Sequence, residues 1–270
     1  MLVYPHINPI ALSLGPLKVH WYGLMYLCGF GCGWGLGTWR AKQKNSGWHP
    51  DEVGDVIFFA AMGVILGGRL GYVLFYEPSR ALADPLWIVR VWEGGMSFHG
   101  GMLGVLIAMF LFARQTGRTF FQITDFIAPL VPPGLFFGRI GNFIGGELWG
   151  RPVSDPSLPW AMIYPHVDNL PRHPSEIYEA LTEGLLLFVV LWLYSSKPRP
   201  RMAVSGFFLV GYGVARFCME FFREPDADQG FLFWGWVTKG QLLSAPMVIA
   251  GMILMFLAYR RNTNAQPSHS

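Results

Sequence analysis

The chain has 270 residues, of which 52% are hydrophobic and only 14% are charged, compared with roughly 25% charged residues in soluble domains. This composition excludes an ordinary soluble globular protein and indicates a membrane protein. The net charge of +3 is dispersed, without a lysine-rich run or a basic patch interleaved with aromatic residues. Nucleic acid is therefore not an expected partner, and the lipid bilayer, including its anionic lipids, is.

Seven mostly apolar segments have about the 20 residues that a helix needs to cross a bilayer. They lie at residues 18–39, 55–76, 95–113, 121–141, 175–194, 203–222 and 240–259. We therefore predict an all-α polytopic membrane protein with seven transmembrane helices. The short connections favour a single integral membrane domain over residues 1–270. Pro132, Pro133 and Gly134 predict a kink or break in the fourth helix.

The distribution of Lys and Arg predicts the orientation, because short loops rich in these residues stay in the cytoplasm. Ten of them follow the first, third, fifth and seventh helices, and seven lie in the opposite connections. We expect the N-terminus outside and the C-terminus in the cytoplasm. The long, Pro-rich connection at residues 142–174 should form a small ordered cap on the outer side, between helices 4 and 5. The polar tail at residues 262–270 should be disordered.

Two polar residues of the first two helices each allow two interpretations. Tyr22 follows Trp21 near the outer end of the first helix, where aromatic residues form interfacial belts, but it could instead face a polar cavity. Arg69 lies inside the second apolar run. It could snorkel to the interface, or it could form an ion pair with the protein or with a ligand.

His99 opens the third helix between the glycine pairs Gly94–Gly95 and Gly100–Gly101. Histidine can exchange a proton near neutral pH. A lone histidine is commonly structural, but this one lies on the predicted outer side together with Arg139, so a general base or a substrate-orienting residue is the competing interpretation. A serine protease built from Ser97 and His99 is disfavoured, since side chains two positions apart on a helix diverge.

The segment Gly138–Pro152 places Arg139, Asn142 and Glu147 directly after an apolar run. An arginine at the centre of the membrane costs about 2.5–3.5 kcal/mol on insertion scales, so such residues usually have a function. The glycines of this segment, including Gly150, allow backbone N–H groups to approach a ligand closely. Positive charge and accessible amides suit an anionic lipid head group.

Three polar residues of the sixth helix, Tyr212, Arg216 and Glu220, are four positions apart and share one helix face. Arg216 can pair with Glu220, or it can join Arg139 in holding one phosphate between two guanidinium groups. The sequence contains no metal-binding motif and no phosphate-binding loop. The cysteines Cys28, Cys32 and Cys218 lie in apolar segments, where free cysteine behaves as a small hydrophobic residue.

Taken together, these segments resemble the prolipoprotein diacylglyceryl transferase family over essentially the whole length. The resemblance is most specific from Arg139 to Gly150 and extends to residues 69–76, 93–101 and 212–226. One position departs from the family pattern, which usually has Asn where this chain has Gly145.

The resemblance implies a multi-pass enzyme of the bacterial inner membrane that needs no cofactor and no metal. Such an enzyme transfers the sn-1,2-diacylglyceryl group of phosphatidylglycerol to the lipobox cysteine in the signal peptide of a prolipoprotein. A thioether forms and sn-glycerol 1-phosphate is released, which is the first step of lipoprotein maturation. The outer side of the protein would then be the periplasmic side, and the active site would lie near it.

The resemblance also implies roles for individual residues. Arg139 and Arg216 would hold the phosphate, and His99 is the candidate general base. The predicted substrate-binding residues are Tyr22, Arg69, Asn142, Glu147, Gly150, Tyr212 and Glu220.

Two alternatives stay open at this stage. The thiol proton could go to His99, or the thiol could be polarised by the arginines alone. A lipid translocator or transporter is the competing function, since such proteins also contain intramembrane charges and broken helices. The chain shows no convincing internal repeat of the kind that translocators usually contain.

Overall fold

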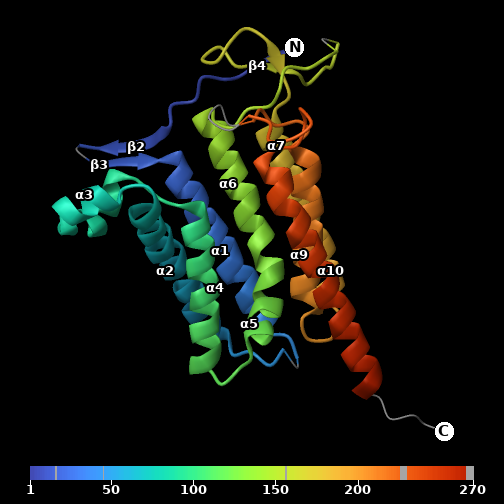
Figure 1. Cartoon of the computed structure of the whole chain (residues 1–270). Coiled ribbons are helices and arrows are strands. Elements are labelled where there is room, and N and C mark those ends of the chain that lie inside the picture. Colours follow the sequence, from blue (N-terminus) through green and yellow to red (C-terminus); the bar gives the residue numbers. More distant parts are fainter. Residues whose placement is uncertain (16, 45, 156, 226–229, 266–270) are drawn as a thin grey trace. The chain divides into compact units, whose positions relative to one another are not determined.

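A computed structural model describes residues 1–15, 17–44, 46–155, 157–225 and 230–265 (Figure 1). It is mainly helical and divides into two compact units. One unit comprises Met1–Gly33 together with Asp125–Ser270, and the other comprises Trp34–Thr124. Asp226 of the sixth-helix motif, Pro156 of the expected cap and residues 266–270 of the expected tail lie outside the described residues.

Among the described residues, five helices are long and apolar enough to cross a membrane. They are α2 (Pro50–Phe75), α4 (Phe98–Gln115), the helical run Phe120–Gly145, the run Ser175–Ser195, and Lys239–Arg261 within α10 (Lys239–Ala265). These spans confirm a polytopic membrane protein. The other two expected spans contain α1 (Trp21–Ala41), which is rich in glycine and aromatic residues, and the shorter apolar helix α9 (Ala203–Met219).

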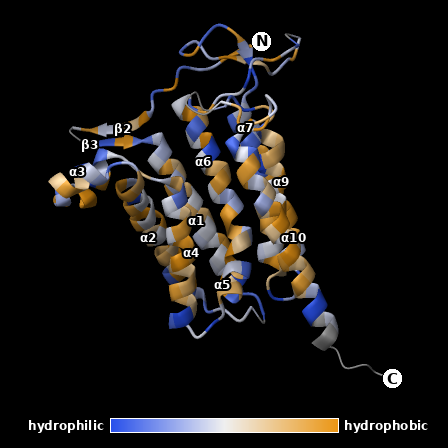
Figure 2. Cartoon of the chain, viewed as in Figure 1, coloured by the Kyte–Doolittle hydropathy of each residue, from blue (hydrophilic) through white to orange (hydrophobic). Residues whose placement is uncertain are grey.

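The helix surfaces are those of a protein surrounded by lipid. Figure 2 shows hydrophobic residues along the helix bodies and hydrophilic ones gathered near many helix ends. Large apolar side chains are exposed on these surfaces, for example Phe75 at 81% and Phe256 at 63%. Apolar side chains in these positions can contact hydrocarbon tails without a cost in hydration.

The unit Trp34–Thr124 is built on close contact between α2 and α4. A Cβ atom on Gly67 would lie 2.4 Å from the carbonyl oxygen of Gly100, and one on Gly104 would lie 2.1 Å from that of Gly63. Only glycine permits this approach, which is typical of helix pairs in membranes. Between the two helices the chain forms α3 (Pro78–Ala83), η1 (Pro85–Val89) and η2 (Val91–Glu93).

The fourth expected span is interrupted next to the predicted position. After α5 (Phe120–Ile127) the chain forms a 3₁₀ turn, η3 (Ala128–Leu130), and then α6 (Val131–Gly145). Pro132 and Pro133 lie in the first turn of α6, where a proline does not remove an intrahelical hydrogen bond. The proline pair therefore marks the start of a helical segment.

Asp125 of α5 binds the start of another helix, α9. Its carboxylate accepts hydrogen bonds from the backbone N of Met202 at 2.7 Å and from the backbone N of Ser205 at 2.8 Å. The hydroxyl of Ser205 also donates to it, at 2.6 Å. Asp125 therefore satisfies the free N–H groups at the start of α9.

The helical fold also contains short strands that the sequence did not predict. One sheet has the order β1 (Leu2–Val3), β4 (Met162–Ile163) and β5 (Pro171–Arg172), and β2 (Ile10–Leu14) forms a hairpin with β3 (Leu17–His20). Consequently α1 begins at Trp21, whereas the sequence predicted a helix from residue 18. Strands of two to five residues are too short for an alternating hydrophobic pattern to identify them.

The connection between α6 and α7 (Ser175–Glu179) contains short strands and a small core where it is described. It contributes β4 and β5 and a small core of Tyr4, Met162 and Tyr164, against which Phe143 and Trp149 pack. We call residues 142–174 the cap. The N-terminal strand β1 pairs in parallel with β4, so the first residues of the chain pack against the cap.

Candidate active site

The two predicted phosphate ligands, Arg139 and Arg216, meet at two glutamates of a neighbouring helix. Arg139 Nε lies 2.9 Å from Glu179 Oε2, and Arg139 Nη2 donates to Glu183 Oε2 at 3.1 Å. Arg216 Nη1 donates to Glu179 Oε1 at 2.8 Å and lies 3.6 Å from Glu183 Oε1. The glutamate side chains are fully buried, so their charges require these partners. We call these four residues together with Glu220 the arginine–glutamate cluster.

Glu220 extends the cluster to the start of α10. Arg216 pairs with Glu220 one turn further along α9, as the spacing predicted. The second carboxylate oxygen of Glu220 accepts a hydrogen bond from Thr238 Oγ1 at 2.6 Å. Thr238 in turn accepts from the backbone N of Gln241 at 3.2 Å, so a residue that caps α10 also orients Glu220.

The helix that supplies Glu179 and Glu183 has an unusual geometry at this position. The run Ser175–Ser195 consists of α7, a π-helical segment η4 (Ala180–Leu186) and α8 (Leu187–Ser195). Gly184 allows η4 to lie against α6, because a Cβ atom there would be 2.6 Å from the Cβ of Phe136. Short π-helical segments are rare and occur frequently at functional sites.

Glu176 is a further buried carboxyl group at the start of the same helix. It is fully buried, and its Oε2 accepts a hydrogen bond from the Tyr164 hydroxyl at 3.0 Å. Burial raises the pKa of Tyr164, so the phenol stays protonated and able to donate this bond. Glu176 thus connects the core of the cap to the helix that carries the cluster.

Tyr212 shares the helix face of Arg216 and adds a hydroxyl near the cluster. It is close enough to Glu183, Arg216 and Arg139 to interact with each of them electrostatically. Its ring stacks on Phe208 at a centroid distance of 5.9 Å. The structure therefore brings four predicted site residues together: Arg139, Tyr212, Arg216 and Glu220.

A second group of predicted residues surrounds the hydroxyl of Tyr22. The side chain of Asn142, 7% exposed, lies within hydrogen-bonding reach of this hydroxyl, and Glu147 is close enough to interact with it electrostatically. Gly141 makes room for the ring, because a Cβ atom there would lie 2.8 Å from Tyr22 Cδ2. Tyr22 thus faces polar groups, although its ring is also 43% exposed.

Gly150 lies against two backbone segments, one in the cap and one after α9. A Cβ atom at this position would lie 2.3 Å from the carbonyl oxygen of His173 and 2.7 Å from that of Phe222. Its own carbonyl accepts a hydrogen bond from Arg172 Nη1 at 2.9 Å. These contacts give Gly150 a role in packing, and its contact with a substrate stays a prediction.

Arg69 is buried at 3% exposure, which excludes the snorkelling interpretation. Its guanidinium donates to four backbone carbonyls and lies 4.3 Å above the centre of the Trp87 ring. The acceptors are Trp87, Ile88, Gly94 and Gly95. Arg69 therefore organises the chain that leads into α4, and its binding to a substrate stays a prediction.

His99 lies in the first turn of α4, as predicted, and is exposed with its ring edge-on to Phe98. Ser97, two positions before His99, caps α4, since its hydroxyl accepts a hydrogen bond from the backbone N of Gly100 at 3.2 Å. This cap gives Ser97 a structural role and removes the reason to consider it a nucleophile. His99 belongs to the unit Trp34–Thr124, and the arginine–glutamate cluster belongs to the other unit.

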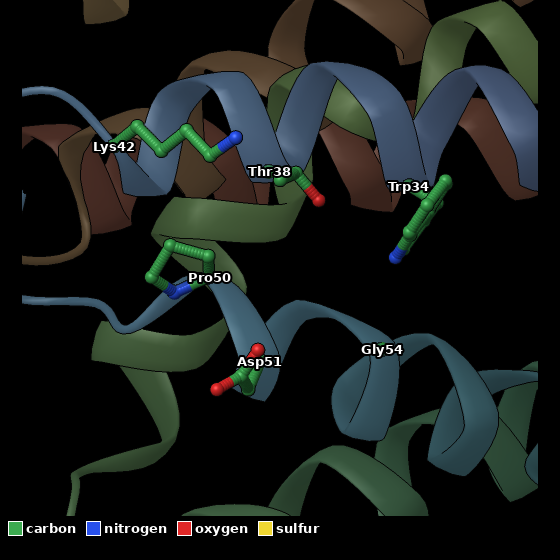
Figure 3. Close-up of a pocket in the computed structure, with 6 residues that line it drawn as sticks. All are labelled: Trp34, Thr38, Lys42, Pro50, Asp51 and Gly54. Atoms are coloured by element: carbon green, nitrogen blue, oxygen red, sulfur yellow. The ribbon is translucent and has the colours of Figure 1, made fainter.

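A cavity of about 490 Å³ lies between the last turns of α1 and the first turns of α2 (Figure 3). Its lining residues are Trp34, Thr38, Lys42, Pro50, Asp51 and Gly54. The cationic group in this lining is the ammonium group of Lys42, and the carboxylate of Asp51 also lines the cavity. The arginine–glutamate cluster, with two guanidinium groups, is therefore the better candidate for binding a phosphate. In the described part of the chain, no group of three or more His, Cys, Asp or Glu residues could hold a metal ion.

Glu179 and Glu183 are the site residues that the sequence reading missed. A signal was present: Glu176, Glu179 and Glu183 are three and four positions apart within an apolar run, so they share one helix face at membrane depth. The same argument identified Tyr212, Arg216 and Glu220. Chemically, the cluster can hold a phosphate on its guanidinium groups and can accept a proton on its carboxylates.

Comparisons with known proteins give a consistent result. A family model described as prolipoprotein diacylglyceryl transferase matches residues 9–257. A protein of Acinetobacter baumannii (strain ACICU) named phosphatidylglycerol–prolipoprotein diacylglyceryl transferase is 62% identical over 262 residues, covering 97% of this chain and 96% of the relative. A protein of the same name from Psychrobacter arcticus is 53% identical over 285 residues, with the same coverage.

Proposed function

We infer the function from one premise: the chain belongs to the prolipoprotein diacylglyceryl transferase family. It is an enzyme that transfers the sn-1,2-diacylglyceryl group of phosphatidylglycerol to the lipobox cysteine of prolipoproteins. A thioether forms, and sn-glycerol 1-phosphate leaves. The pair of guanidinium groups in the arginine–glutamate cluster is the observation that carries this proposal, because the leaving group is a phosphate and its charge needs cationic partners.

We propose the following membrane arrangement. α1 and α9 complete seven spans with the five long apolar helices, in the bacterial inner membrane. The N-terminus and the cap are periplasmic, and the C-terminal tail is cytoplasmic. The excess of Lys and Arg in the connections after the odd-numbered spans supports this orientation.

We assign the lipid head group to the cluster and its neighbours. Arg139 and Arg216 hold the phosphate, because planar guanidinium groups bind phosphate with two parallel hydrogen bonds each. Tyr212 and Glu220 flank the arginines, while Tyr22, Asn142, Glu147 and Gly150 shape the site on the side of the cap. Arg69 supports the segment that presents His99.

The acceptor cysteine must lose its proton, because the thiolate is the reactive nucleophile. Either His99 accepts this proton, or the positive charge of the arginines stabilises the thiolate and no dedicated base is needed. The two routes differ in their dependence on pH: with a histidine base the rate depends on the protonation of an imidazole, and with arginines, which stay charged, it does not.

The first experiment uses the purified protein with phosphatidylglycerol and a lipobox peptide that carries either cysteine or serine. Release of glycerol phosphate that depends on the cysteine supports the transferase. A protein that moves the lipid and forms no thioether would instead be a translocator.

Arg139→Ala is expected to lower the turnover number by about 10²–10³, the usual loss when one stabilising donor of a developing anion is removed. It also leaves Glu179 and Glu183 with one cation fewer, so Arg139→Lys is the matched variant that keeps the charge and loses the planar fork. Turnover close to that of the unmodified protein in both variants, with normal membrane insertion, would overturn the assignment of Arg139.

A further inference from the structure

We propose that Glu183 is a catalytic residue that accepts the proton of the acceptor thiol, after the phosphate of the lipid has displaced it from the arginines. This inference rests on the proposed function. It replaces both routes given above, a His99 base and a reaction without a base, with a base that belongs to the arginine–glutamate cluster.

The two central glutamates are held unequally. Both carboxylate oxygens of Glu179 lie within 2.9 Å of a guanidinium nitrogen. Glu183 has one such contact at 3.1 Å, and its Oε1 lies 3.6 Å from Arg216 Nη1, beyond a good hydrogen bond. Each glutamate accepts one arginine hydrogen bond, and the second oxygen of each, Glu179 Oε2 and Glu183 Oε1, has no hydrogen-bond donor among the described residues, so the two differ in the distances of their ion pairs. Glu183 therefore has the longer contacts with the arginines, and we assign it as the carboxylate that the phosphate displaces.

The charges of the cluster make a release necessary. Two guanidinium groups face the carboxylates of Glu179, Glu183 and Glu220, so an added phosphate would increase an existing excess of negative charge. Excess charge is expensive in a buried site. The phosphate is accommodated when it replaces a carboxylate on the arginines.

A displaced Glu183 carboxylate has the surroundings of a base. The charged and titratable groups that face it are Arg139 from α6, Arg216 and Tyr212 from α9, and Glu179 from its own helix. Once the phosphate occupies the arginines, the carboxylate has lost its counter-ions and binds a proton more readily. Its position inside the π-helical segment η4 agrees with the frequent occurrence of this geometry at functional sites.

The step balances without another reactant. The S–H bond of the cysteine breaks, and its proton moves to the Glu183 carboxylate. The sulfur forms a bond to the glyceryl carbon while the C–O bond to the phosphate breaks, and the electron pair of that bond stays on the phosphate oxygen. The glycerol phosphate then takes the proton from Glu183 as it leaves, so the carboxylate returns to the arginines.

Glu183→Gln is the decisive variant, because it keeps the size of the side chain and removes the base. We expect the turnover number at pH 7 to fall by about 10²–10⁴, the usual contribution of a general base. The binding of phosphatidylglycerol in nanodiscs should be retained or tightened. The remaining rate should rise about tenfold per pH unit until the thiol ionises by itself, near pH 8.5.

Asp51→Asn is the matched control for a carboxylate-to-amide change, since the Asp51 side chain is 91% exposed at the start of α2. It should keep the rate and pH profile of the unmodified protein. If the unmodified protein and this control release no glycerol phosphate, the proposed function itself is wrong. If both are active, the Glu183 variants test this inference alone.

Two results would overturn the role of Glu183 in an active protein. One is a turnover number of Glu183→Gln within threefold of normal with an unchanged pH profile. The other is a loss of activity that high pH does not recover and that is accompanied by weaker lipid binding, which would make Glu183 a structural counter-ion. If Glu183→Gln does not fold, Glu183→Asp decides: a reduced turnover number with normal lipid affinity supports the base, and unchanged turnover overturns it.

Discussion

A buried guanidinium group can donate its hydrogen bonds to the backbone or to a substrate, and Arg69 donates to the backbone. Its N–H groups donate to carbonyls of η1 and of the Gly94–Gly95 turn. The guanidinium groups of Arg139 and Arg216 instead pair with carboxylates. Backbone carbonyls stay in place during a reaction, whereas carboxylates can exchange for another anion. Arg69 therefore acts on the reaction only through the segment that it positions.

Arg69→Lys is expected to lower the free energy of unfolding by about 1–3 kcal/mol, because a lysine cannot reach all four carbonyls and leaves buried acceptors unpaired. The thermal midpoint in detergent measures this loss. Arg80→Lys is the control, since the Arg80 side chain is 54% exposed. An equal midpoint for both variants would show that the buried hydrogen bonds of Arg69 do not contribute to stability.

At the scale of single residues, the sequence identified both arginines of the arginine–glutamate cluster and one of its three glutamates. Arg139, Arg216 and Glu220 were predicted from charge at membrane depth and from a spacing of four. Arg139 lies 40 and 44 positions before Glu179 and Glu183, and Arg216 lies 37 and 33 positions after them, so no local pattern pairs these residues. Long-range partners of this kind follow from the fold.

At the scale of elements, the helix pair α2–α4 depends on the absence of side chains. Gly67→Ala is expected to lower the free energy of unfolding by about 1–3 kcal/mol or more, because the new Cβ atom would meet the backbone carbonyl of Gly100 at 2.4 Å. Rigid backbone on both sides leaves no simple relaxation. Resistance to thermal unfolding in detergent is the measurement.

Gly54→Ala in the same helix is the matched control, since no atom lies within 4 Å of the position that its Cβ would occupy. It should be neutral or stabilising by up to about 1 kcal/mol, because alanine favours the helix over glycine. If Gly54→Ala and Gly67→Ala destabilise the protein equally, the effect belongs to glycine in general and the close contact is not its cause.

Apolar runs predict helices well and small strands poorly. Each of the seven runs contains a helix, since about 20 apolar residues can satisfy their backbone groups in a bilayer only in this way or in a closed barrel. The two-residue strands β1 and β4 pair over a separation of about 160 positions, which no local pattern encodes. Hydrophobic periodicity also did not predict the π-helical segment η4 or the 3₁₀ turn η3.

At the scale of the whole molecule, the cap joins distant parts of the chain through Arg172. This residue pairs with Asp168 at 2.6 Å and with Glu224 at 3.1 Å, and it donates to the carbonyl of Gly150. The hydrogen bond from Arg172 lowers the pKa of Asp168 below its usual value. A carboxyl group with a lowered pKa in the folded state stabilises that state only while it is ionised.

The cap should therefore loosen in acid. The contribution of Asp168 is complete above its unfolded pKa of about 3.9 and is lost as the pH falls through the lower folded value. Hydrogen exchange of residues 150–173 between pH 6 and pH 3 measures this. Asp168→Asn should show the faster exchange already at pH 6, and equal protection of both proteins at pH 6 would contradict the prediction.

The glycine contact between α2 and α4 also has a consequence for how the chain is made. Both helices lie within Trp34–Thr124, so the ribosome completes them before it reaches Glu179, Glu183 or Arg216. Their contact needs no later segment, and the two helices can join as soon as α4 leaves the translocon. The segment that carries His99 would then be assembled during synthesis, and the arginine–glutamate cluster could form only after α9 has been inserted.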